Sequence, residues 1–203
     1  MKMNLSKLGI GINRLLMLTL VGLVLMACSP QQSFKNVDIT GGKAFGTDFS
    51  LLDPDGKVRT LADFKGKVVV MFFGYTQCPD VCPTTLTEMQ QAMTLLGPKA
   101  DQVQVLFVTL DPERDSARIL KQYVPAFDSR FLGLRPADEV SLEKVAKDFK
   151  IYYKQVPGTS PGSYTMDHTA GSYAFDPKGN LRLYIKHAQG PETLAQDLKE
   201  LMK

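Results

Sequence analysis

The sequence is poor in the residues that build disulfide frameworks and metal clusters. Its 203 residues include three cysteines, two histidines and no tryptophan. Three cysteines can form one disulfide at most, which excludes a small domain held together by several disulfides. We also find no internal repeat and no low-complexity tract, so a repeat architecture is excluded.

The chain likewise lacks an excess of charge. Its formal net charge of +3 comes from three basic residues in the first 27, Lys2, Lys7 and Arg14, where there is no acidic residue. The remainder has 21 basic and 21 acidic residues. Nothing in this balance indicates a nucleic-acid partner or a polybasic membrane-binding patch.

The only long apolar run is at the N-terminus. Leu15 to Ala27, "LLMLTLVGLVLMA", follows the basic residues and is too short to span a bilayer comfortably, which is typical of an export signal. It ends in "LMAC", which resembles a bacterial lipobox with Cys28 as the lipidated residue. We expect residues 1–27 to be a lipoprotein signal peptide and residues 28–45 a lipid-anchored flexible tether. The protein would then be held on the periplasmic side of a membrane. An uncleaved signal anchor and an ordinary secretory signal are the alternatives.

The rest of the chain, residues 46–203, has the pattern of one α/β domain. Apolar β-branched runs predict buried strands, and apolar residues at helical spacing predict helices. The expected elements are a hairpin at 49–61, strands at 67–73, 103–110 and 131–134, helices at 83–96, 119–123, 142–149 and 191–201, a Gly-, Pro-, Ser- and Tyr-rich loop at 152–170, and two strands flanking a turn at 176–180.

A pair of cysteines at the first strand-to-helix junction narrows the fold class. The segment "GYTQCPDVCP" places Cys78 and Cys82 directly after the strand at 67–73 and before the helix at 83–96. Together with the order of elements, this position predicts a thioredoxin-like fold. Its central sheet would be flanked by helices, with an N-terminal hairpin and a loop insertion before the last hairpin.

The chemistry of the pair stays open at this point. Unpaired backbone amides and the positive end of the helix dipole favour the thiolate, which both attacks disulfides and binds metals. Thioredoxin-type enzymes have two residues between their cysteines, whereas Cys78 and Cys82 are separated by three. The spacing alone therefore allows a disulfide, a metal site or a nucleophile.

A metal held by two sulfurs needs at least one more ligand, and the chain has two histidines. His187 follows a predicted strand, where solvation or a local hydrogen bond accounts for it. His168 lies in "YTMDHTAGSY", in the loop that approaches the cysteines in a thioredoxin-like fold. The residues alone leave two interpretations of His168 equally open: it is a metal ligand, or it is a solvated loop residue or a partner of Asp167.

Three segments, "GYTQCPDVCPTTL", "VTLDPERDS" and "YTMDHTAGSY", resemble the signature segments of the Sco/SenC family in their order and spacing. The resemblance covers nearly all of the chain from about residue 45. It implies a thioredoxin-like fold and copper bound as Cu(I) or Cu(II) by Cys78, Cys82 and His168. It also implies a metallochaperone that assists copper insertion into the copper A site of cytochrome c oxidase. The expected partners are the copper A subunit and a thiol reductant or copper donor, and we expect a monomer. Closing the cysteines into a disulfide would remove the site.

Nearby residues have simpler interpretations. Asp167 is either an acid that orients His168 or a solvated side chain. Packing accounts for Met166. In "DPERDS", turn formation and helix capping account for Asp115, so we expect it to give structural support.

Two other functions compete. The first is a membrane-tethered thiol-disulfide reductase that acts on the copper-site cysteines of a partner through Cys78 and Cys82. Against it, "TMDHTAGSYAF" offers no proline where thioredoxin-type enzymes have one. The second is a thiol peroxidase, which needs an arginine beside the thiolate, and Arg114 and Arg135 are the candidates.

Overall fold

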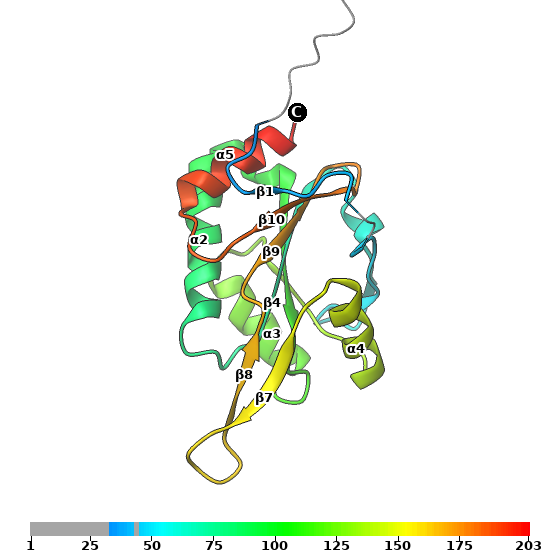
Figure 1. The fold of residues 1–203 in the computed structure, drawn as a ribbon, viewed down its shortest axis with the longest axis vertical. Helices are drawn as coiled ribbons and strands as arrows, with labels where there is room; N and C mark the ends of the chain where they lie inside the picture. The colour runs from blue at the N-terminus through cyan, green and yellow to red at the C-terminus, as the bar shows by residue number, and fades with distance from the viewer. Residues whose placement is uncertain (1–32, 43–44) are drawn as a thin grey trace, which may run out of the picture. The chain divides into compact units, whose positions relative to one another are not determined.

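Residues 33–42 and 45–203 are described by a computed structural model of the protein (Figure 1). Contacts group Phe34–Lys203 into one unit. The predicted signal peptide at 1–27 and the predicted lipidation at Cys28 lie outside the described residues. Within the described part, no helix is both long enough and apolar enough to cross a membrane.

A mixed six-stranded sheet forms the centre, in the order β1-β10-β9-β4-β5-β6. Strands β4, β5 and β6 run parallel to one another. The other pairs are antiparallel: β9 with β4, β10 with β9 and β1 with β10. The strands are β1 (Val37–Asp38), β4 (Val68–Gly74), β5 (Val103–Thr109), β6 (Leu132–Leu134), β9 (Ser172–Phe175) and β10 (Leu181–Ile185).

Helices cover both faces of this sheet. They are α2 (Val81–Leu96), α3 (Ala117–Tyr123), α4 (Glu139–Asp148) and α5 (Pro191–Leu201), with short 3₁₀ turns η1 (Leu61–Phe64), η2 (Gly97–Gln102) and η3 (Val124–Ala126). In Figure 1, α2 and α5 lie on one side of the sheet and α4 on the other. Every residue of β4 is buried, because successive side chains enter cores on opposite faces. Val70 and Phe72 pack with α2 and α5, while Met71 and Phe73 pack with α4. The predicted thioredoxin-like fold class is confirmed.

The expected N-terminal hairpin is present as β2 (Leu51–Leu52) and β3 (Val58–Arg59). The Asp53 carboxylate closes the turn by accepting hydrogen bonds from the backbone N–H groups of Asp55 and Lys57 and from the Arg59 side chain.

The insertion before the last hairpin differs from the expected loop, because it is itself an antiparallel hairpin. Strands β7 (Tyr153–Pro157) and β8 (Tyr164–His168) pair with Tyr153 opposite His168. The Gly-, Ser- and Pro-rich stretch serves as the turn, where the Gly158 N–H donates to the Ser163 carbonyl at 2.8 Å. In Figure 1 this hairpin extends from the end of the sheet. His168 is therefore the last residue of a strand and not a loop residue.

Residues before 46, where the domain was predicted to begin, also contact the rest of the fold. The segment predicted to be a tether contains β1, whose Val37 pairs with Tyr184 of β10. The buried Asp197 carboxylate of α5 accepts hydrogen bonds from the backbone N–H groups of Lys35 and Asn36 and from the Asn36 side chain, at 2.8 to 2.9 Å. An edge strand was not anticipated here because two residues carry no measurable periodicity.

Candidate metal centre

The cysteines lie on the loop and first helical turn that follow β4. This strand ends at Gly74, and α2 begins at Val81, so the amides of the first helical turn face the loop. A Cβ atom at Gly74 would lie 2.7 Å from the Cys82 Sγ, well inside van der Waals contact. Glycine at this position therefore lets the Cys82 sulfur pack directly against the strand end.

The two thiols have different surroundings. Cys82 is fully buried in the core on the α2 side of the sheet, whereas Cys78 is half-buried. The Cys82 N–H donates to the Cys78 Sγ at 3.4 Å. Neither cysteine is in a disulfide.

These surroundings separate the acidities of the pair. A hydrogen bond from the Cys82 thiol lowers the pKa of Cys78 to about 4, and the backbone N–H groups of Asp80 and Cys82 add to the effect. The pKa of Cys82 is raised, because its proton is held by Cys78 and because it is buried. Near neutral pH the pair thus carries one thiolate, Cys78, and one thiol, Cys82.

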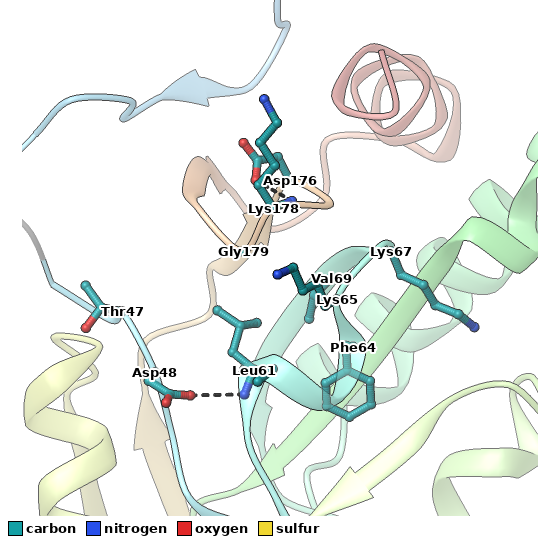
Figure 2. Close-up of a pocket in the computed structure, with 11 residues that line it drawn as sticks. Thr47, Asp48, Leu61, Phe64, Lys65, Lys67, Val69, Asp176, Lys178 and Gly179 are labelled. Atoms are coloured by element: carbon teal, nitrogen blue, oxygen red, sulfur yellow. Dashed lines mark hydrogen bonds between the residues drawn. The ribbon is translucent and has the colours of Figure 1, made fainter.

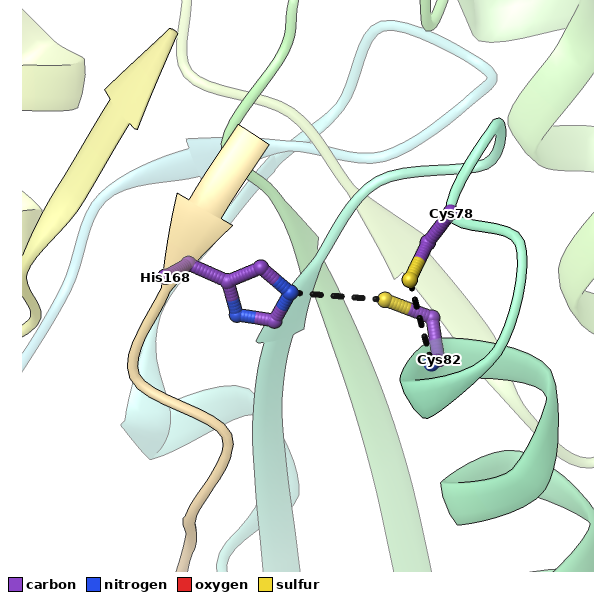
Figure 3. Close-up of side chains that lie close together, drawn as sticks. All are labelled: Cys78, Cys82 and His168. Carbon is purple, nitrogen blue, oxygen red and sulfur yellow. Dashed lines mark hydrogen bonds between the residues drawn. The ribbon is translucent and has the colours of Figure 1, made fainter. Parts of the chain in front are cut away.

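His168 completes the cluster from β8. Its Nε2 lies 3.6 Å from the Cys82 Sγ (Figure 3). Its Nδ1 lies 2.9 Å from the Thr169 carbonyl oxygen. A carbonyl oxygen only accepts, so Nδ1 donates to Thr169 and Nε2 is the ring nitrogen that faces the sulfurs. The imidazole also makes edge contacts with the rings of Phe72 and Tyr75.

The three side chains converge on one point. One donor atom each from Cys78, Cys82 and His168 lies within 4.8 Å of the other two, and Figure 3 shows both sulfurs and the imidazole turned toward one another. A metal bonded at about 2.3 Å to sulfur and about 2.0 Å to nitrogen allows a sulfur–nitrogen separation of 3.6 Å. Two thiolates and a neutral imidazole are soft and borderline donors, which suit Cu(I) or Zn(II).

The other residues singled out in the sequence have structural contacts. Met166 packs against the core, as expected. His187 lies 3.0 Å through its Nδ1 from the hydroxyl of Thr85 on α2, a partner distant in sequence and not the local hydrogen bond that was expected. Asp167 is exposed on β8 opposite Lys154. Thr169 therefore orients the imidazole, a role that the sequence did not indicate because a backbone carbonyl leaves no signature.

Asp115 gives the structural support that was predicted. Its fully buried carboxylate accepts hydrogen bonds from the backbone N–H and hydroxyl of Thr76, at 3.0 and 2.5 Å, and from the Thr109 hydroxyl at 2.6 Å. Thr76 precedes Cys78 by two residues, so Asp115 ties the cysteine loop to the end of β5.

The two arginines considered for a peroxidase bond elsewhere. Arg114 contacts Asp111, Gln77 and Tyr164, and Arg135 donates to the Pro112 carbonyl. Neither guanidinium bonds to a cysteine sulfur, which is the contact that a peroxidase needs.

A separate cavity of about 290 Å³ lies near the start of β4 (Figure 2). Its lining includes Asp48, Leu61 and Val69, with the Leu61 N–H donating to the Asp48 carboxylate at 3.0 Å. The cysteines follow the opposite end of β4, and the lining has no cysteine or histidine, so this cavity is not part of the metal centre.

Fold and site together define a thioredoxin-like protein with a Cys–Cys–His metal-binding cluster in place of a thioredoxin-type active site. The family model described as SCO1/SenC matches residues 37–203. The chain belongs to the SCO1/SenC family.

Individual relatives agree with this assignment. The mitochondrial SCO2 homologue of Bos taurus is 37% identical over 157 residues, which cover 76% of this chain and 59% of that protein. The chain thus spans about three fifths of the length of that relative. Copper-bound ScoI of Bradyrhizobium japonicum is 42% identical with a TM-score of 0.70, covering 77% of this chain and 98% of the other. A SCO1/SenC family lipoprotein of Bacillus anthracis is 25% identical with a TM-score of 0.65, covering 77% and 94%.

Proposed function

We propose that this protein binds copper through Cys78, Cys82 and His168 and assists copper insertion into the copper A site of cytochrome c oxidase. One observation carries the proposal: the Cys78 and Cys82 sulfurs and a ring nitrogen of His168 all lie within 4.8 Å of one another. Two sulfurs and an imidazole form a donor set that suits a soft monovalent cation. The copper-bound state of the 42% identical ScoI supports copper over zinc.

The surroundings of the sulfurs suit reversible loading. Cys78 already carries the thiolate near neutral pH, so it provides the first anionic donor, and Cys82 loses its proton when copper binds. Because Cys78 is half-buried while Cys82 is fully buried, a partner can reach the cluster from the Cys78 side. Exposure on one side is what transfer of the metal to another protein demands.

Redox state would control the same site. Forming the Cys78–Cys82 disulfide transfers two electrons to an oxidant, such as a disulfide of another molecule, and releases the Cys82 proton. Both sulfurs are then unavailable to copper. A thiol reductant would restore the site, which makes a reductant or a copper donor the second expected partner.

We further propose that Cys28 carries a lipid anchor that holds the domain on the periplasmic side of a membrane. The "LMAC" segment supports this, as does the existence of a family lipoprotein in Bacillus anthracis. The copper A subunit of the oxidase, in this arrangement, is a partner at the same membrane.

Copper titration of a soluble form that begins at Ser29 tests the ligand set. We expect stoichiometric binding under reducing conditions, and for Cu(II) a sulfur-to-copper charge-transfer band. His168→Ala should weaken binding and change that band. His187→Gln is the matched control, since it removes the other histidine and should leave both unchanged. A His168→Ala spectrum identical to that of the unsubstituted protein would rule out the three-ligand site.

The reductase remains a second candidate because Cys78 is a half-buried, acidic thiolate. The same acidity argues against it. Stabilising the reduced pair raises the reduction potential, so the pair becomes a poor donor of electrons. Rapid reduction of insulin disulfides by the copper-free protein would favour the reductase.

A further inference from the structure

Arg114 lies where three segments meet: its own loop after β5, the cysteine loop and β8. Its side chain is 18% exposed. The sequence analysis considered this residue only as a peroxidase arginine, and its contacts point to a different role.

On one side, Arg114 closes a triangle with Asp111 and Tyr164. Its Nε donates to the Asp111 carboxylate, and its Nη1 donates to the Tyr164 carbonyl at 2.9 Å. The Tyr164 hydroxyl donates to the same Asp111 carboxylate at 3.0 Å. The guanidinium carbon also lies 3.5 Å from the centre of the Tyr164 ring. Tyr164 is the first residue of β8, so the triangle fixes the start of the strand that ends at His168.

On the other side, Arg114 reaches the cysteine loop. Its Nη1 lies 3.3 Å from the Gln77 side-chain oxygen, directly before Cys78. Its guanidinium carbon is 5.7 Å from the centre of the Tyr75 ring, which in turn meets the His168 ring edge-on at 6.0 Å. One side chain therefore contacts both segments that supply the proposed ligands.

At the His168 end of β8, the Met166 side chain packs against the core and the imidazole meets the rings of Phe72 and Tyr75. The β7–β8 hairpin pairs only with itself as a two-stranded sheet and does not join the central sheet. The position of β8 therefore depends on side-chain contacts made along its length, and the Arg114 triangle is the contact at its start. Lysine could keep a charge near Asp111 but could not stack on Tyr164 while donating in two directions.

We propose that Arg114 is a positioning residue for the metal centre, which holds the strand bearing His168 against the cysteine loop. It does not touch the metal or a thiol. This inference rests on the proposed copper site where it is tested by copper affinity. A second test, by hydrogen exchange, is independent of copper.

The variant Arg114→Met tests it, because methionine keeps an unbranched apolar chain and loses the guanidinium. Arg135→Met is the matched control, since Arg135 donates to Pro112 and makes no hydrogen bond to β8. Removing a residue that supports a metal ligand typically lowers metal affinity 10- to 100-fold. We expect Arg114→Met to bind Cu(I) about 10-fold more weakly. Arg135→Met should bind as tightly as the unsubstituted protein.

A double-mutant cycle distinguishes positioning from general damage. If Arg114 acts through His168, then Arg114→Met should change copper affinity little in a His168→Ala background. The charge-transfer spectrum of Arg114→Met should shift toward that of His168→Ala. Equal losses of affinity in both backgrounds would overturn the proposal.

Hydrogen exchange of the copper-free protein provides the independent readout. Amides of β8 should exchange faster in Arg114→Met and not in Arg135→Met. If the unsubstituted protein bound no copper, the proposed function would be wrong, but the exchange result would still test the positioning role of Arg114. Unchanged exchange of the β8 amides in Arg114→Met would overturn that positioning role. Should Arg114→Met fail to fold, Tyr164→Phe removes only the hydroxyl of the triangle, and the same β8 amides should exchange faster in that variant.

Discussion

At the scale of single residues, the site depends on how its three side chains handle protons. The hydrogen bond from the Cys82 thiol lowers the pKa of Cys78 to about 4, the same bond and burial raise the pKa of Cys82, and His168 donates from Nδ1 to the Thr169 carbonyl. This arrangement gives the cluster one anionic sulfur near neutral pH and turns Nε2 toward the sulfurs. Residue types alone do not specify it.

Cys82→Ala tests the acidity of Cys78. Because the Cys82 thiol is the largest cause of the low value, its removal should raise the pKa of Cys78. In the unsubstituted protein, the ultraviolet absorbance of the thiolate should persist from neutral pH down to about 4 and be lost below it. In Cys82→Ala it should be lost at a higher pH. A superimposable titration would show that the Cys82 thiol does not set the acidity.

Gly74→Ala tests the packing of the Cys82 sulfur. The added methyl group would meet the Cys82 Sγ at 2.7 Å and the Phe107 ring at 3.0 Å, so the sulfur must move. We expect a loss of about 1–3 kcal/mol in unfolding free energy together with weaker copper binding. Gly133→Ala is the control, because its methyl group would crowd Leu120 and Val124 and should cost stability without changing copper affinity. Equal copper affinities in the two variants would contradict this reasoning.

At the scale of elements, the site joins the start of a helix to the end of a strand that come from distant parts of the chain. Backbone amides at the start of α2 lie beside the cysteine sulfurs, and β8 positions the imidazole of His168. Buried polar side chains at the end of β5 tie these elements together. Asp115 ties down the cysteine loop, and Asp111 joins Arg114 to Tyr164.

Asp115→Asn tests the tie between β5 and the cysteine loop. An amide cannot accept all three hydrogen bonds that the buried carboxylate accepts, so at least one donor loses its partner. We expect a loss of about 1–3 kcal/mol, measured by urea unfolding. Asp167→Asn, on the exposed face of β8, is the control and should change stability by less than about 0.5 kcal/mol. If the two variants were equally stable, the tie would carry no energy.

At the scale of the whole molecule, the segment that leads from the proposed anchor is part of the fold. It adds β1 to the edge of the sheet and supplies three hydrogen-bond donors to the buried Asp197. The folded unit therefore begins at Phe34, and the proposed tether would lie before it.

Two truncated forms test this boundary. A chain that begins at Phe34 should unfold at the same urea concentration as one that begins at Ser29. A chain that begins at Thr40 loses β1 and leaves the Asp197 carboxylate without its three donors, which should cost about 3–5 kcal/mol. Equal stability of the Phe34 and Thr40 forms would contradict the assignment of β1 to the domain.

Local patterns predicted most of the elements. The apolar β-branched run at 67–73 predicted a strand buried on both faces, and the cysteines directly after it were predicted to lie at a strand-to-helix junction. The hairpin at β7 and β8 was missed because its glycines, serines and prolines suggested a loop. A signal was nevertheless present, since Tyr164, Met166 and His168 alternate and point toward the protein in β8.

The sequence by itself determined the fold class and the two cysteines as a reactive pair, because these depend on periodicity and on neighbours in the chain, and the resemblance of three segments to a known family indicated the family. Whether His168 was a ligand or a solvated side chain was left open by its residue type. Only the tertiary structure brought its Nε2 to 3.6 Å from Cys82 and turned Nδ1 to Thr169. The same holds for the contacts of Arg114 with Gln77 and Tyr164 and for those of Asp197 and β1, whose partners lie far away in sequence. Contacts of this kind depend on how elements pack, and no local pattern encodes them.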